Sequence, residues 1–278
     1  MSAVETNLLA AGPQRLITRT AEVVEAAQRI LDLAKAGAKG KIAEAGGVDE
    51  AQHAAHGLAW LATTVEALRQ MNLWAARLQE EGSFGEFEQL LLLAAFGEYG
   101  AQIAGGIPMS QLEIIRPEAL GVSKADIRKY EDAVADVIEA GSAQGVKAKL
   151  ATLIEHAQGS TTFGNSGLDE TMAAIHEQMR SFSEAEVVPH AHEWHLENAY
   201  IPLEIIQQVA ELGVFGLTLP EEYGGLGLGE RAMWVGAGEG WRCAPPPGQA
   251  GRRLCPPPRR RGPAPPARTR CRRRAAAC

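Results

Sequence analysis

Apolar residues recur at spacings of three and four along the first 158 residues, a pattern that predicts amphipathic helices. We expect a first helix over residues 14–37, closed by Gly37 and Gly40 because glycine weakens a helix interior. A second helix is expected over residues 48–80, where the apolar positions fall on one face. Those positions are Leu58, Leu61, Val65, Leu68, Ala75 and Leu78.

A third predicted helix, residues 84–103, is apolar on more than one side and is therefore expected at the centre of a helical bundle. A turn rich in glycine and proline follows it from Gly105 to Ser110. Ser123 is a predicted N-cap. Shorter helices are predicted over residues 114–120, 124–139 and 146–158. No pattern in residues 1–158 is typical of a run of strands, so the predicted fold class is all-α.

The composition divides the chain into four parts. Residues 159–168 are small, polar and aperiodic, so they are predicted to be a linker after a helical N-terminal extension of residues 1–158. Helical periodicity returns over residues 169–232. Residues 233–278 form an Arg/Pro-rich tail that is predicted to be disordered.

Two helices are expected in the third part. The first should begin at Asp169, and it should end near Val188 and Pro189, because proline disrupts a helix interior. The second should open with Pro202 at its first position and close at Gly213.

Charge and cysteine follow the same division. From Arg231 onward the chain has 12 Arg and one acidic residue, which leaves a net charge of −18 for residues 1–230. A strongly acidic folded part argues against nucleic-acid binding.

The four cysteines all lie in the tail, at Cys243, Cys255, Cys271 and Cys278. They lack the close pairing of a zinc site, and a cysteine-free folded part suits a reducing compartment. We therefore expect a cytoplasmic protein without a signal peptide or membrane span.

The most specific string in the chain, PEEYGGLGLG at residues 220–229, directly follows the second of these helices. Leu219 is expected to be extended because it precedes a proline. The four glycines permit positive φ angles and close approach of the backbone to other groups. A turn after a helix is the simplest interpretation. The glycine spacing and the absence of a following Gly-Lys-Ser/Thr exclude a phosphate-binding loop.

Together with the residues before it, this string resembles the N-terminal α-domain of the acyl-CoA dehydrogenase family. The shared pattern has a Val-Pro near the end of one helix, a proline-opened helix, ELGVFGL at residues 211–217, and then PEEYGGLG. The resemblance is specific and covers residues 169–232. The Ala-rich extension before it, with its turn from Gly105 to Gln111, resembles one branch of the family, since most members lack such an extension.

The resemblance implies α,β-dehydrogenation of an acyl-CoA. In the family, a glutamate removes the α-proton, FAD accepts the β-hydride, an electron-transfer flavoprotein takes the electrons, and the enzyme is a homo-oligomer. The flavin contacts and the glutamate come from later domains. No catalytic or cofactor-binding residue is therefore predicted here, and FAD is not expected to bind this chain. Tyr223, Gly224 and Gly225 are expected to line the substrate site.

The tail departs from the family pattern soon after Arg231. Arg, Pro, Ala and Gly share codon families with G or C at the first two positions, so we infer that the tail is an out-of-frame translation of GC-rich DNA. The change of frame is predicted between Gly229 and Gly236. Translation of the other two frames tests this idea, and the lack of a family-like continuation in both would refute it. As written, the chain is expected to be inactive.

A second interpretation remains open. The tail can be a genuine Pro/Arg-rich extension, in which case the chain is a helical interaction protein with a basic disordered tail. Such a tail would attract phosphate nonspecifically or bind a proline-recognising domain.

Two groups of histidines invite a metal interpretation. His190, His192 and His195 miss the His-Glu-x-x-His pattern because residue 196 is leucine. His53 and His56 lie three apart on a long predicted helix. A solvated or packed position is the simpler interpretation for all five, so no metal site is predicted.

Overall fold

The structure is a computed structural model that describes residues 8–157 and 164–240. Within those residues it is helical apart from one short hairpin, which confirms the all-α fold class. The chain forms two compact units, Met1–Thr171 and Met172–Cys278. The predicted disordered tail lies outside the described residues from position 241 onward.

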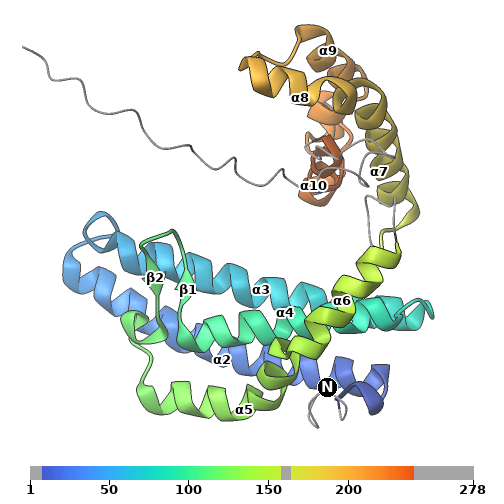
Figure 1. The fold of residues 1–278 in the computed structure, drawn as a ribbon. Helices are drawn as coiled ribbons and strands as arrows, with labels where there is room; N and C mark the ends of the chain where they lie inside the picture. Colours follow the sequence, from blue (N-terminus) through green and yellow to red (C-terminus); the bar gives the residue numbers. More distant parts are fainter. Residues whose placement is uncertain (1–7, 158–163, 241–278) are drawn as a thin grey trace, which may run out of the picture. The chain divides into compact units, whose positions relative to one another are not determined.

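The first unit is a bundle of long helices with one continuous apolar core. Its helices are α2 (Pro13–Ala45), α3 (Gln52–Glu80), α4 (Glu86–Gly105), α5 (Lys124–Ser142) and α6 (Gln144–His156). Helix α4 contacts each of the other four, as its all-round apolar sequence predicts. Figure 1 shows α2, α3 and α4 running alongside one another. The side chains of Leu90, Leu92, Leu93 and Phe96 on α4 are fully buried.

Helix α2 continues through both glycines that were predicted to close it. The reason is tertiary, because a Cβ atom on Gly37 would lie 2.1 Å from the carbonyl oxygen of Leu120. Gly37 therefore permits close contact with the segment η2 (Pro117–Leu120) and does not end the helix. The helix ends instead at Gly46, which adopts the left-handed conformation with φ 92°.

The prediction of a helix over residues 114–120 is also wrong. Ile114–Ile115 forms strand β2, which pairs antiparallel with β1 (Ile107–Pro108), and the 3₁₀ segment η2 follows. Arg116 is extended because it precedes Pro117, and this prevents a helix from crossing the two residues. The predicted stop after α4 is confirmed, and the chain there turns into the hairpin.

Helix α5 begins as predicted, with the Ser123 hydroxyl accepting a hydrogen bond from the Asp126 N–H at 3.1 Å. It runs to Ser142, beyond the expected end at residue 139. Here Gly141 lies so close to α4 that a Cβ would stand 2.1 Å from the carbonyl oxygen of Leu93.

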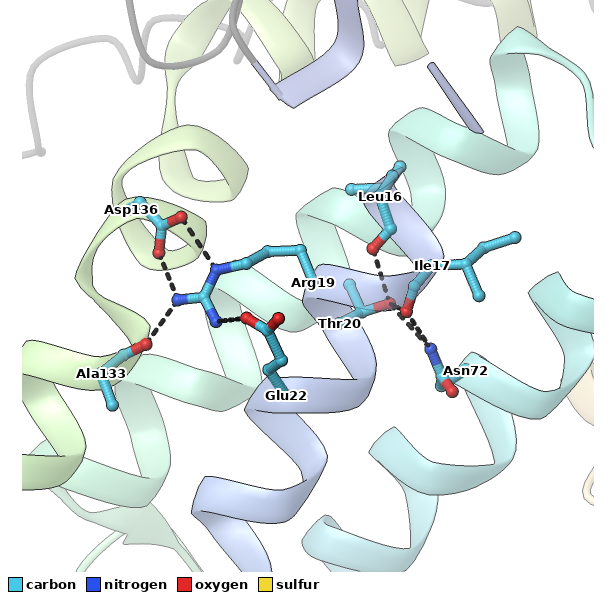
Figure 2. Close-up of polar contacts among 8 residues, drawn as sticks. All are labelled: Leu16, Ile17, Arg19, Thr20, Glu22, Asn72, Ala133 and Asp136. Carbon is cyan, nitrogen blue, oxygen red and sulfur yellow. Dashed lines mark hydrogen bonds and ion pairs between the residues drawn. The ribbon is translucent and has the colours of Figure 1, made fainter. Parts of the chain in front are cut away.

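Buried and half-buried polar contacts join the helices of the bundle (Figure 2). Arg19 on α2 binds both carboxylate oxygens of Asp136 on α5, at 3.0 Å from Nε and 2.7 Å from Nη2. Its Nη1 also lies 2.8 Å from Glu22. On the other side of α2, the Asn72 amide of α3 donates to the hydroxyl of the buried Thr20 at 2.9 Å. These contacts fix the register of α2 against both neighbours.

We expect acid to weaken the contact between α2 and α5. The hydrogen bonds from Arg19 hold the pKa of Asp136 below its ordinary value. Such a carboxyl stabilises the fold above its unfolded pKa of about 3.9, and this stabilisation is lost as pH falls through the lower folded pKa. Asp136→Asn should lower the free energy of unfolding by about 1 kcal/mol at pH 7, a modest loss because Asp136 is partly exposed. The loss should be much smaller at about pH 2.5.

Urea unfolding of the wild type and the variant at the two pH values measures this difference. Asp132→Asn, an exposed position on the same helix, is the matched control and should change the stability little at either pH. An equal cost for Asp136→Asn at both pH values would contradict the expectation.

The second unit consists of shorter helices. They are α7 (Glu170–Phe182), the π-helical segment η3 (Ser183–Val187), α8 (Val188–Glu197), α9 (Leu203–Glu211) and α10 (Gly229–Gly240). Pro189 does not end the first helix as predicted. The Val188 N–H bonds to the Ser183 carbonyl, five residues back, and this wide turn accommodates a proline that has no N–H of its own.

Three predicted boundaries in this region shift. Pro202 is the N-cap of α9 and not its first helical residue. Residues 164–167, predicted to be linker, contact the bundle through hydrogen bonds to Glu88 and Trp74. The boundary expected after residue 232 falls inside α10, so residues 233–240 are helical. Gly213 closes α9 as predicted, with φ 78°.

Candidate functional site

The loop between α9 and α10 holds the residues that were predicted to line the substrate site. After Gly213 the chain makes two 3₁₀ turns, η4 (Val214–Gly216) and η5 (Glu221–Tyr223). Gly224, Gly227 and Gly229 all have positive φ, at 81°, 61° and 74°. These values confirm the conformational role predicted for the glycines, because other residues rarely adopt them.

The loop folds back on itself through its main chain. A Cβ on Gly225 would lie 2.1 Å from the Leu219 carbonyl oxygen, so only glycine fits there. The N–H groups of Leu226 and Leu228 bond to the carbonyls of Gly216 and Leu217, at 2.9 and 2.8 Å. The loop is therefore held closed by hydrogen bonds between its two arms.

The N–H groups from Tyr223 to Leu228 are all used within the loop. Those of Tyr223 and Gly225 bond to the Pro220 carbonyl, that of Gly224 to Glu221, and that of Gly227 to Leu219. A phosphate-binding loop needs free N–H groups that converge on the anion. This loop offers none of these six, which agrees with the exclusion made from the glycine spacing.

The side chains of the loop offer an apolar surface instead. Tyr223 is 75% exposed, and Phe215, Leu219 and Leu226 are each about half exposed or more. The adjacent carboxylates of Glu221 and Glu222 are also exposed. A surface of this kind suits an apolar chain better than a phosphate, because the two acids repel a nearby anion.

The interior below the loop is small and apolar. Leu217 and Ala232 are buried, and Gly236 of α10 lies against Leu217 and against Met179 of α7. These contacts position the loop on the α7–α10 pair. The structure brings Tyr223, Gly224 and Gly225 together at one turn, with Gly224 and Tyr223 outward and Gly225 packed against Leu219.

The histidines have other neighbours. His190 stacks on Trp194, with ring centroids 5.7 Å apart, and His56 accepts a hydrogen bond from Trp60 at 2.9 Å. His53 faces Glu113 of the hairpin at 3.9 Å. Over residues 8–157 and 164–240, no three His, Cys, Asp or Glu side chains are grouped closely enough to hold a metal ion.

Sequence reasoning missed the polar residues of the bundle interior. Glu88 on α4 is a buried carboxylate, and Thr20 is fully buried on α2. Thr20 did carry a signal, since it lies four residues after Leu16 and three before Val23 on an apolar face. The hydroxyl of a buried polar residue needs hydrogen-bond partners, and that of Thr20 lies 3.0 Å from the carbonyls of Leu16 and Ile17 and accepts a bond from Asn72.

Residues 169–249 match the N-terminal domain of acyl-CoA dehydrogenases. The match extends beyond Gly236, the last position predicted for a change of reading frame, and its final residues, 241–249, lie outside the described part of the chain. It begins at Asp169, where the resemblance was placed from the sequence.

Two proteins are similar to this chain. The (2S)-methylsuccinyl-CoA dehydrogenase of Cereibacter sphaeroides is 45% identical over 225 residues, which cover 79% of this chain and 40% of that protein. The glutaryl-CoA dehydrogenase of Desulfococcus multivorans is 34% identical over 70 residues, or 25% of this chain and 18% of that protein. The first alignment is longer than the stretch from residue 169 to residue 278, so much of the helical bundle is aligned as well.

The chain thus spans less than half the length of each relative. None of the helices in its described residues is both long enough and apolar enough to cross a membrane.

Proposed function

We propose that this chain, which belongs to the acyl-CoA dehydrogenase family through residues 169–249, is part of an FAD-dependent enzyme. The enzyme would oxidise methylsuccinyl-CoA to mesaconyl-CoA. The observation that carries the proposal is the 45% identity to a methylsuccinyl-CoA dehydrogenase over an alignment that includes the helical bundle. The reaction removes hydrogen from the α and β carbons of the acyl group. We place it in the cytoplasm, in the ethylmalonyl-CoA pathway, with an electron-transfer flavoprotein as acceptor and in a homo-oligomer.

The loop between α9 and α10 does not fit a flavin site. The pyrophosphate of FAD needs free N–H donors or cationic side chains, whereas the loop amides from Tyr223 to Leu228 are bonded internally and the carboxylates of Glu221 and Glu222 lie beside them. The buried carboxylate Glu88 belongs to the bundle and bonds to a main-chain N–H there. We therefore propose that the 278-residue chain binds no FAD and is inactive by itself. We also propose that the Arg/Pro-rich tail is out of frame, although the family match continues to residue 249.

The loop from Pro220 to Gly229 is our proposed contribution to the substrate site. Tyr223 would pack on the acyl chain or the pantetheine arm, because its ring is exposed beside the apolar Leu219 and Leu226. Gly224, where an added Cβ would meet nothing within 4 Å, would let the ligand approach the main chain closely, and Gly225 would hold the turn in place through its packing against Leu219. The loop supplies binding and orientation, and it holds no group that could remove a proton from carbon.

An assay of the complete dehydrogenase, in which residues 1–232 of this sequence continue in frame, tests the proposal. The complete protein should be a flavoprotein that reduces an artificial electron acceptor with methylsuccinyl-CoA, whereas the 278-residue chain should carry no flavin absorbance. In the complete protein, Tyr223→Ala should raise KM by at least about tenfold, because burial of an aromatic ring is worth about 1.5–3 kcal/mol, and should change kcat little.

The matched control is Tyr200→Ala, a tyrosine of the same unit that is fully exposed and lies outside the loop. It should leave both kinetic constants unchanged. Stoichiometric flavin on the 278-residue chain would refute the claim that the cofactor site is missing. An unchanged KM in Tyr223→Ala would refute the substrate-lining role, and a preference for another acyl-CoA would refute the substrate.

A helical interaction protein remains the alternative function. The observation that favours it is the apolar surface of the second unit, where no residue of α9 is buried and Leu203 and Ile206 are exposed. In the dehydrogenase these side chains would be covered by further chain. A 278-residue chain that is monodisperse and melts cooperatively would favour the alternative.

A further inference from the structure

We propose that Glu88 and Trp74 form a docking site on the bundle for four residues of the same chain, 164–167, here termed the anchor segment. By holding the anchor segment, this site sets the point at which the chain leaves the bundle for the second unit. The inference does not depend on the dehydrogenase proposal. It rests on contacts within the first unit alone.

Both main-chain polar groups of Asn165 bond to side chains of the bundle. Its N–H donates to Glu88 Oε1 at 2.8 Å, and its carbonyl accepts from the indole Nε1 of Trp74 at 3.1 Å. Glu88 is only 6% exposed, so its carboxylate needs such a donor in place of water. The Trp74 ring is itself held edge-on against Phe84, with ring centroids 6.2 Å apart. The two bonds make Asn165 the centre of the contact.

The two glycines that flank the contact fit the site in conformation and in size. Gly164 has φ 75°, and an added Cβ would lie 2.9 Å from Glu88 Oε1. Gly167 has φ 60°, and an added Cβ would lie 3.2 Å from Leu78 and 3.3 Å from Trp74. The Asn165 side-chain oxygen also accepts the N–H of Gly167 at 2.9 Å, which closes a turn between them. The site therefore selects the pattern Gly-Asn-x-Gly.

Docking shortens the tether between the units. Helix α6 ends at His156 and α7 begins at Glu170, so the undocked connection would comprise residues 157–169. With the anchor segment bound, only residues 168 and 169 separate Gly167 from α7. Docking therefore leaves a two-residue connection before α7 in place of one of 13 residues. The composition of residues 159–168 suggests a free linker, whereas the contacts make its second half part of the bundle.

Amide hydrogen exchange of the full 278-residue chain tests the proposal. In the wild type, the amides of Asn165 and Gly167 should exchange at least about tenfold more slowly than unprotected amides. Glu88→Ala removes the acceptor, and Trp74→Phe removes the indole donor but keeps an aromatic ring. Each should abolish most of this protection, whereas the α4 amides from Leu90 to Phe96 should stay protected.

Glu131→Ala, an exposed glutamate of α5, is the control and should leave the anchor segment protected. Gly167→Ala is a further variant that strains only the anchor segment, and it should release the segment with the bundle intact. If Glu88→Ala unfolds α4, the exchange rates of Gly167→Ala and Trp74→Phe still test the docking of the anchor segment. Unprotected exchange of residues 164–167 in the wild type, or unchanged protection in Trp74→Phe and Gly167→Ala, would overturn the proposal.

Discussion

Replacement of Gly37 by alanine should lower the free energy of unfolding by about 2–4 kcal/mol, because the new methyl group has no space. Its Cβ would lie 2.1 Å from the Leu120 carbonyl oxygen and 2.9 Å from the Gly121 Cα. Both atoms belong to the main chain, so α2 and η2 would have to move apart. Equilibrium unfolding in guanidinium chloride measures the change.

Gly40, three residues later on the same helix, provides the matched control. A Cβ at Gly40 meets no atom within 4 Å, and α2 continues past it to Ala45. Gly40→Ala should therefore stabilise the protein by about 0.5–1 kcal/mol through helix propensity alone. The two substitutions are chemically identical and should have opposite signs. A stabilising Gly37→Ala would show that this close contact is absent.

Leu92→Ala should destabilise the bundle by about 3–5 kcal/mol. Leu92 is fully buried on α4, the helix that contacts every other helix of the bundle, and its truncation leaves a cavity between tightly packed elements. A loss of this size should lower Tm by roughly 6–20 °C for a unit of about 150 residues. Thermal unfolding followed by far-ultraviolet circular dichroism measures it.

Truncation of the neighbouring Leu91 tests whether the loss of stability depends on burial and not on residue type. It belongs to the same run of four leucines but is 38% exposed. Leu91→Ala should cost less than about 1 kcal/mol, because part of its surface is already in water. Equal losses for the two variants would contradict the placement of α4 at the centre of the core.

Local signals in the sequence were sufficient where the cause was local. Ser123 caps α5 through its own hydroxyl, and Gly213 closes α9 with a positive φ, as their positions predicted. The apolar stripe of α3 is buried along Leu61, Val65, Leu68 and Leu78 because a 3.6-residue period determines which residues share a face. The existence of the long helices was therefore predictable.

Two of the errors arose where a distant segment decides the role of a residue, and one had a local cause. A glycine that ends a helix and one that permits a close crossing look the same in a sequence, and Gly37 is the second kind because of Leu120. The helix expected at residues 114–120 failed for a local reason that was overlooked, since Pro117 forces Arg116 to be extended. The anchor segment was missed because its partners, Glu88 and Trp74, lie about 80 to 90 residues earlier.

The candidate site was predictable in its main chain but not in its surface. The positive φ angles of Gly224, Gly227 and Gly229 follow from the glycine pattern. That every N–H from Tyr223 to Leu228 is bonded inside the loop follows only from how its two arms meet. The chemical character of the loop surface, apolar and acidic, required the structure.

The π-helical segment between α7 and α8 has a consequence for comparing relatives. Such a turn holds one more residue than an α-helix of the same path, and the side chain of Ser183 is buried in it without a hydrogen-bond partner in the described residues. Deletion of one residue from positions 183–187 would therefore restore an uninterrupted α-helix and leave the faces of α8 unchanged relative to α7. A one-residue gap at this place in an alignment would mark a relative that lacks the wide turn but keeps both helices and the same outward face of α8.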